Sequence, residues 1–191
     1  MRSLYVLGLV YLAISGFALW RGPRAVPPSP EMTGSYAEPG TDGGAWFRQV
    51  KPLCNSLEVE TAQRRHPAPE TMEGAGFAAA CWALAGRIDE ARARILGVST
   101  DERWRAAGIV FEIGHPIADM GDDRSAGPIM ELVVEFWPNH YMALYHAGAA
   151  RYATGDFDAA KRHLVEFLRY YHQQDGWTAN ARTMLERLGV E

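Results

Sequence analysis

The chain has 191 residues, of which 48% are hydrophobic and 22% charged, so it can form one folded domain with a buried core. Its formal net charge of −4 argues against a nucleic-acid-binding protein, which usually presents a basic face. Only two cysteines occur, without a CxxC or CxxCH pattern, and this excludes a zinc ribbon, a thioredoxin-like site and a c-type haem attachment.

The chain begins with an uncharged apolar segment. Leu4–Trp20 (LYVLGLVYLAISGFALW) contains 17 residues, and as a helix it would measure about 25 Å, the lower end of the length that spans a bilayer. Tyr5 and Trp20 would lie at the two membrane interfaces, where aromatic side chains are favoured. We interpret residues 1–20 as a transmembrane anchor.

The same segment has a second interpretation, a signal peptide cleaved after the small-residue pattern Gly16-Phe17-Ala18. The positive charges on its two sides are nearly balanced, so they do not set the orientation. Both interpretations carry the rest of the chain out of the cytoplasm. The expected location is the cytoplasmic (inner) membrane, crossed once, with the folded domain on the periplasmic or extracytoplasmic side.

A linker is predicted to follow. Residues 21–45 contain five of the eleven prolines and five glycines, and they show no apolar periodicity. This composition is typical of a tether that is partly polyproline-like and partly flexible. The folded domain is therefore expected to occupy residues 46–191.

The two cysteines lie in the first two predicted helices of this domain, of which the entry helix is expected over Trp46–Arg65. Cys54 precedes Pro67, near the centre of the next loop, by almost the same number of residues as Cys81 follows it. Positions equidistant from the loop of an antiparallel helix pair face each other at a distance that suits a disulfide. Outside the cytoplasm we expect Cys54 and Cys81 to be bonded; the alternative is two buried thiols.

A pattern of small residues and aspartate recurs at intervals of about 34 to 35 residues, which is the period of a helix–turn–helix repeat array. The matching positions are Gly155, Asp156 and Ala160 with Gly121, Asp122 and Ala126; Gly148 with Gly114; and, further back, Gly86 and Ala91.

This pattern resembles the tetratricopeptide repeat (TPR), over roughly residues 69–172. The best match is ALYHAGAARYATGDFDAAKRHLVEFL, followed by GIVFEIGHPIADMGDDRSAGPIMELVVEFWP and then GFAAACWALAGRIDEARARIL. The resemblance implies an all-α, right-handed solenoid of helical hairpins, with about three TPR-like repeats between entry and capping helices. Because one unit cannot bury its apolar face alone, the units must stack.

Some positions depart from the family pattern. The large aromatic residue near the start of the first helix is replaced by Leu144 in the last unit and by Ala75 in the first. Pro116 and Pro128 fall inside predicted helices, so we expect the middle unit to be kinked. The capping helix is expected within DGWTANARTMLERLG, with Asp175 as its N-cap and Gly189 beyond its end.

One stretch, EIGHPIADMGDD, concentrates polar side chains. His115 and Asp119 are spaced i, i+4, so one helical face would present both, and such a pair can hold a metal or transfer a proton. The alternative is a structural histidine beside a helix-capping turn, since Asp122 aligns with Asp156 at a helix start. No nucleophile, zinc-protease or nucleotide-binding motif occurs. We therefore assign no catalytic residue, metal ligand or cofactor.

In the resembled family the first helix of each unit lines a concave groove. The resemblance places Glu73 and Gly76 there in the first unit. An aromatic, lightly charged lining suits an apolar peptide or a partner helix, and the alternative is that these side chains form the core. The lining residues expected in the second and third units are Phe111, His115, Asp119, Met142, Tyr145 and Tyr152.

These observations favour a non-catalytic function. We expect a membrane-tethered protein–protein interaction scaffold, as an accessory or stabilising subunit of an extracytoplasmic or membrane protein complex. One alternative is an adaptor that recruits peptides reversibly. Another is a metal-dependent or acid–base enzyme centred on His115 and Asp119. The expected partners are proteins in or at the membrane, and not nucleic acid.

We predict that the N-terminal segment is retained, because Leu4–Trp20 has interfacial aromatic residues and only a weak cleavage pattern. The intact mass of protein extracted from membranes should include the residues before Arg21. A mature chain that starts near Leu19 would contradict the anchor.

Overall fold

The computed structural model describes residues 26–30, 36 and 42–190, and in this part of the chain it is all-α, as predicted, without a strand. A short 3₁₀ helix, η1, follows the first described helix. The elements are α2 (Asp42–Val50), η1 (Lys51–Leu53), α3 (Val59–Arg65), α4 (Met72–Leu84), α5 (Ile88–Leu96), α6 (Arg103–Asp119), α7 (Asp123–Phe136), α8 (Tyr141–Thr154), α9 (Phe157–Tyr170) and α10 (Gly176–Arg187).

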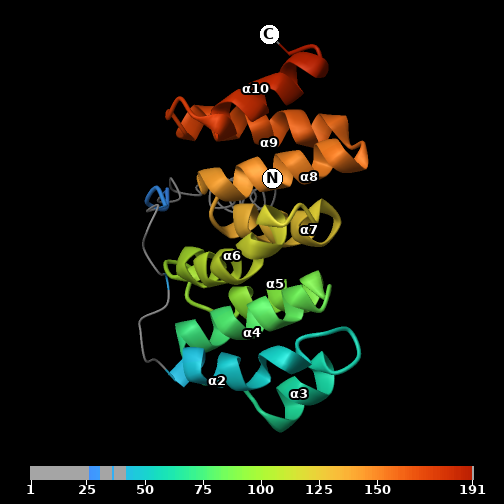
Figure 1. Cartoon of the computed structure of the whole chain (residues 1–191). Helices are drawn as coiled ribbons and strands as arrows, with labels where there is room; N and C mark the ends of the chain where they lie inside the picture. Colours follow the sequence, from blue (N-terminus) through green and yellow to red (C-terminus); the bar gives the residue numbers. More distant parts are fainter. Residues whose placement is uncertain (1–25, 31–35, 37–41, 191) are drawn as a thin grey trace, which may run out of the picture.

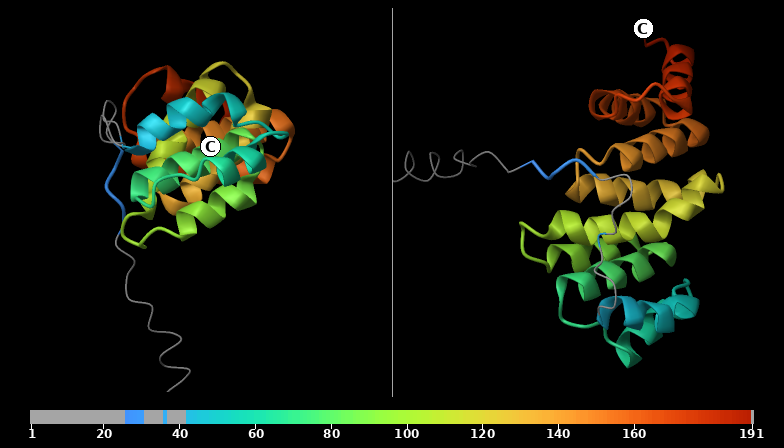
Figure 2. Two further views of the ribbon diagram at one scale, coloured as in Figure 1. Left: turned by 90° about the horizontal axis from the view of Figure 1, so that it is seen from below. Right: turned by 60° about the vertical axis from the view of Figure 1, so that its left-hand side comes forward.

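The helices form an elongated stack of pairs, with α2 and α3 at one end and α10 at the other (Figures 1 and 2). Short turns join α4 to α5, α6 to α7 and α8 to α9. Successive pairs are in contact because α6 packs on α4 and α8 packs on α7. The α2 helix covers α4, and α10 lies against α9 and α8.

The three turns within the pairs have the same backbone geometry. Gly86, Gly121 and Gly155 all adopt a positive φ, between 74° and 85°. In each turn the glycine N–H donates to the carbonyl at i−3, and the N–H of the following residue donates to the carbonyl at i−5. This is the helix-ending arrangement in which glycine avoids the steric cost of a left-handed conformation.

The predicted helix starts are confirmed. The side chain of Asp122 accepts a hydrogen bond from the backbone N–H of Ser125, and that of Asp156 accepts one from Ala159. Asp175 caps α10 in the same way, and Gly189 lies beyond its end with a φ of 73°. Each carboxylate satisfies N–H groups that lack a partner within the helix.

Close approach within the pairs takes place at glycines. A Cβ atom built on Gly114 of α6 would lie 2.7 Å from a methyl carbon of Ile129 in α7, and one on Gly148 of α8 would lie 2.7 Å from Cγ of Leu164 in α9. Both contacts are closer than a real Cβ tolerates. The absence of a side chain therefore lets the two helices of each pair touch.

The predicted entry helix over Trp46–Arg65 is wrong in its extent. The chain forms α2, then η1 with Pro52 in its first turn, then a turn in which Asn55 Oδ1 accepts from the N–H groups of Leu57 and Glu58, and finally α3. Proline fixes φ and cannot donate, and an asparagine turn competes with helix, so the segment breaks there.

The first described helix, α2, begins at Asp42, inside the predicted linker. A Cβ on Gly43 would lie 3.0 Å from the backbone nitrogen of Gly74 in α4. Gly43 therefore allows α2 to pack closely on α4. In the sequence the same glycine adds to a glycine-rich composition that is also typical of a flexible linker.

Cys54 and Cys81 are joined by a disulfide, with their Cα atoms 4.8 Å apart. The bond ties Cys54, the residue that caps the end of η1, to the last turn of α4. Stacked rings of Phe47 and Phe77 also join α2 to α4. The disulfide closes a loop with a sequence separation of 27 residues, which the chain-entropy model values at about 3.5 kcal/mol.

The two internal prolines lie within continuous helices. Pro116 is in α6 and Pro128 is in α7, and both helices continue past them. Among the described residues no helix is long and apolar enough to cross a membrane. The predicted anchor, Leu4–Trp20, lies outside the described residues.

We predict that Gly148→Ala lowers the free energy of unfolding by about 1–2 kcal/mol, because the added methyl group meets the fully buried Leu164 and the cost of overpacking exceeds the gain in helix propensity. Gly176→Ala is the matched control, since a Cβ there meets nothing within 4 Å. Urea denaturation measures both. Equal stability of the two variants would contradict the close approach.

Candidate functional site

Two histidines and an aspartate meet between α6 and α8. His115 and Asp119 lie one turn apart on α6, and His146 reaches them from α8. The Nε2 atoms of His115 and His146 are 3.0 Å apart. Asp119 Oδ1 lies 3.4 Å from the first of these nitrogens and 3.7 Å from the second. Three atoms that can bind a metal ion therefore converge on one point.

The sequence placed His115 and Asp119 on one helical face, where a metal or acid–base pair was an alternative to a structural histidine, and His146 was not expected to join them. His140 and His146 do not share a helical face, and no ligand was expected from either. His146 belongs instead with the first helix of the next pair, and it follows His115 by nearly one repeat period. A search for ligands about one period apart, on facing helices, would have found it.

The cluster is buried on one side and open on the other. His146 is 4% exposed and His115 is half-buried, whereas the side chain of Asp119 is 47% exposed. Burial lowers the pKa of His146 to about 4, and burial also lowers the pKa of His115 although the charge of Asp119 opposes it. Both imidazoles are therefore neutral at pH 7, with a lone pair on each.

Aromatic rings hold the imidazoles in place. Phe111 stacks on His115, with ring centroids 4.6 Å apart. Tyr145 and Trp177 pack edge-on against His146, at 5.2 and 5.6 Å. Rings packed on several sides restrict the rotation of the two imidazoles, and so they fix the direction of the Nε2 atoms.

A third histidine lies behind Phe111. His140 is 1% exposed, and its ring centroid is 4.1 Å from that of Phe111. Its Nδ1 accepts a hydrogen bond from the backbone N–H of Ala143, so His140 caps α8. Burial lowers the pKa of His140 to about 3. A cap of this kind needs an unprotonated Nδ1.

Part of the predicted linker lies against the same region, beside α7 and α8 (Figure 1). The indole Nε1 of Trp137 donates to the carbonyl of Pro28, and Nδ2 of Asn139 donates to the carbonyl of Pro27, both at 2.8 Å. Pro30 is buried. Side chains of the domain therefore bind the backbone of this part of the predicted linker, a contact that its composition does not reveal.

Tyr36 extends this contact to α6. Its backbone N–H donates to the carboxylate of Glu112, and its ring packs edge-on against Trp137, with centroids 4.9 Å apart. A Cβ on Gly108 would lie 2.6 Å from the Tyr36 ring, so the glycine makes room for it. Tyr36 thus packs on α6 at Gly108 and Glu112, which precede His115 and Asp119 along the helix.

The six residues predicted to line a groove fall into two groups. Phe111, His115 and Asp119 lie at or beside the histidine–aspartate cluster. The other three, Tyr145, Met142 and Tyr152, pack in or against the core of α8, α9 and α10. Tyr145 is 5% exposed, its hydroxyl accepts a hydrogen bond from Asn180, and its ring packs on Phe167.

The other two residues of that set, Met142 and Tyr152, are partly buried against the core that α8, α9 and α10 form. The Tyr152 ring lies 6.0 Å from that of Phe157, near the α8–α9 turn.

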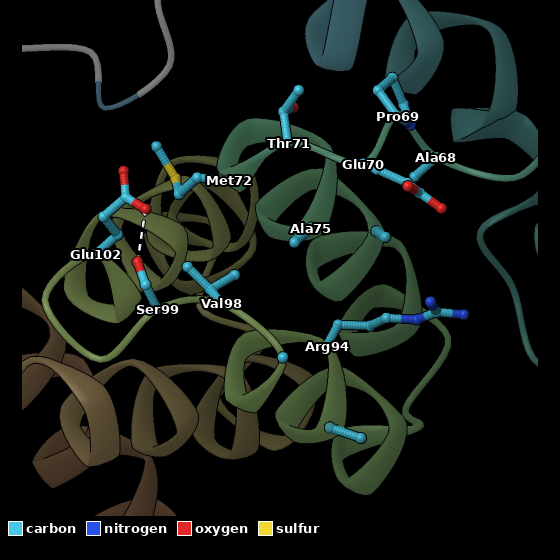
Figure 3. A pocket seen from close by; sticks show the side chains of 13 residues that line it. Ala68, Pro69, Glu70, Thr71, Met72, Ala75, Arg94, Val98, Ser99 and Glu102 are labelled. Atoms are coloured by element: carbon cyan, nitrogen blue, oxygen red, sulfur yellow. Dashed lines mark hydrogen bonds between the residues drawn. The ribbon is translucent and has the colours of Figure 1, made fainter.

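A separate pocket of about 470 Å³ lies between α4, α5 and the loop before α6 (Figure 3). Met72 and Val98 form an apolar wall, Arg94 stands at the rim, and Ser99 donates a hydrogen bond to Glu102 at 2.6 Å. None of the predicted site residues lines it.

Comparison of the chain with protein-family models, curated proteins and solved structures found no match. Function is therefore inferred from the residues described above.

We predict that His140 makes stability depend on pH. Its pKa is about 3 when folded and about 6.5 when unfolded. Below pH 6.5 the unfolded chain binds the additional proton, so the free energy of unfolding falls as the pH is lowered from 6.5 towards 3, by at most about 1.4 kcal/mol per pH unit.

His140→Asn should reduce this slope, because asparagine can still cap α8 but does not titrate. Urea denaturation between pH 4 and 7 measures how steeply the free energy of unfolding changes with pH. Lost packing would lower this free energy equally at every pH, whereas loss of the titrating group changes its dependence on pH. His172→Asn, at an exposed histidine, is the control. An unchanged slope in His140→Asn would show that His140 is not a buried neutral group.

Proposed function

We propose that the protein is a non-catalytic scaffold of three TPR-like helix pairs, arranged as a right-handed solenoid, that holds a partner protein at the membrane. The recurrence of one turn geometry at Gly86, Gly121 and Gly155 supports the assignment of repeats. The close approaches at Gly114 and Gly148, which are one repeat period apart, support it independently.

The single observation that carries the proposal is the docking of the chain's own extended segment. Trp137 and Asn139 donate to successive backbone carbonyls, at Pro28 and Pro27. Aromatic and amide donors that bind the backbone of a proline-containing segment are a recurring mode of peptide recognition. The side chains of Trp137 and Asn139 in the α7–α8 loop, with Glu112 of α6, can therefore bind the backbone of a polypeptide segment.

This docking favours a permanent subunit over the reversible adaptor, because the segment already fills part of the surface that a recruited peptide would need. A partner is then left with the edge of the stack formed by the α6–α7 and α8–α9 turns. Large apolar side chains are exposed on this edge, where Met120 is 77% and Phe157 is 50% exposed. We place the partner there, beside Tyr152.

The membrane location follows from the predicted anchor and from the cysteine pair. A disulfide between Cys54 and Cys81 would persist in an oxidising compartment and would be reduced in the cytoplasm. We therefore propose that the domain faces the periplasmic or extracytoplasmic side, tethered by residues 1–20.

The test is retention of the partner by variants of the full chain, purified from native membranes in mild detergent. Phe157→Ala and Tyr152→Ala each remove a ring at the proposed contact. Loss of such a ring commonly costs more than about 2 kcal/mol, or roughly thirtyfold in affinity. Leu57→Ala is the control, because Leu57 is 90% exposed and directly precedes α3. The α3 helix lies at the opposite end of the stack from α10 (Figure 1).

Melting temperatures show whether each variant is folded. Reduced retention with Phe157→Ala and Tyr152→Ala, but not with Leu57→Ala, is the expected result. Retention that survives both ring deletions but is lost with His115→Ala would contradict the scaffold and favour the alternative of an enzyme.

A further inference from the structure

The distances within the cluster fit one bound ion. The three atoms His115 Nε2, His146 Nε2 and Asp119 Oδ1 are separated by 3.0, 3.4 and 3.7 Å. The point equidistant from atoms so spaced lies about 2.0 Å from each, within the range of Zn–N and Zn–O bonds, about 2.0–2.2 Å. An ion about 0.7 Å above their plane would be close to tetrahedral, with one position open.

From this geometry we propose that His115, Asp119 and His146 bind one divalent transition-metal ion of the zinc type. The inference does not depend on the scaffold proposed above. Two imidazole nitrogens and one carboxylate oxygen suit Zn²⁺, Fe²⁺ or Co²⁺, whereas Mg²⁺ and Ca²⁺ prefer oxygen ligands alone.

The surroundings of the cluster suit a metal site with three protein ligands. Phe111, Tyr145 and Trp177 pack on the two imidazoles, so both nitrogens are directed before an ion arrives. The exposed side of the cluster is that of Asp119, through which an ion and a water ligand can enter. Sites of this composition keep a water or a substrate in the fourth position.

Without an ion the same arrangement is electrostatically poor. The two Nε2 atoms can share one hydrogen bond, with one as donor and the other as acceptor. The carboxylate oxygen of Asp119 lies 3.4 and 3.7 Å from them, longer than a normal charge-assisted hydrogen bond. A cation would give all three atoms an attractive contact. It also ties α6 to α8, so binding stabilises the folded chain by mass action.

The test uses the full chain in mild detergent, without a histidine tag and freed of metal by a chelator. Titration calorimetry with Zn²⁺ should show one ion bound per chain, and bound Co²⁺ should give the visible absorption of a low-symmetry site. The unfolding temperature should rise with Zn²⁺ and not with Mg²⁺.

Asp119→Asn and His115→Gln should each lower the affinity for Zn²⁺ at least tenfold, since even the loss of an outer partner of a ligand costs about 10–100-fold. Asp119 is exposed, so its variant tests the site even where a change at the buried His146 prevents folding. His172→Gln, at an exposed histidine outside the cluster, is the matched control. No saturable binding, or equal affinity in Asp119→Asn, His115→Gln and the unaltered chain, would overturn the proposal.

Discussion

Close approach of helices at small residues is the constraint on which the rest of the structure depends. At Gly148, α8 comes so near to α9 that a single methyl group would collide with Leu164. At Gly127, a Cβ would lie 2.8 Å from that of Ala150, which brings α7 onto α8. Interiors are packed to near-crystalline density, so these contacts set the positions of the helices within narrow limits. The contact at Gly127, together with that of Gly114 in α6 against Ile129 in α7, sets the register of α6 against α8.

That register produces the one group of three metal-ligating side chains found among the described residues. His146 meets His115 because both first helices are held by α7, which packs on each of them. On the same face Tyr36 packs against Trp137, and Trp137 packs against His140 at 4.7 Å. The docked linker, the cap of α8 and the imidazole–carboxylate cluster are therefore neighbours on one aromatic surface. Phe111 lies between the cap and the cluster, since its ring packs on both His140 and His115.

The features that could be predicted from the sequence are those with local causes. The turn at Gly155 and the cap at Asp156 depend on residues within one helix end, and they occur where the spacing places them. His115 and Asp119 share a face because of helix geometry alone. Helix geometry within one helix could not reveal His146, since it contacts His115 from a different helix, α8. Nor could it reveal the docking of Pro28 or the helical state of Gly43, because both depend on tertiary partners, Trp137 and α4, that the local composition does not reveal.

The packing of α6 and α8 brings His115, Asp119 and His146 together, and we propose that the three form a single metal site. Anomalous X-ray diffraction from crystals of the chain grown with Zn²⁺ tests this proposal most directly. We expect one strong peak bonded to His115 Nε2, His146 Nε2 and Asp119 Oδ1, at about 2.0–2.2 Å from each. Histidine side chains that point away from each other, or an ion held by other residues while these three stay apart, would contradict it.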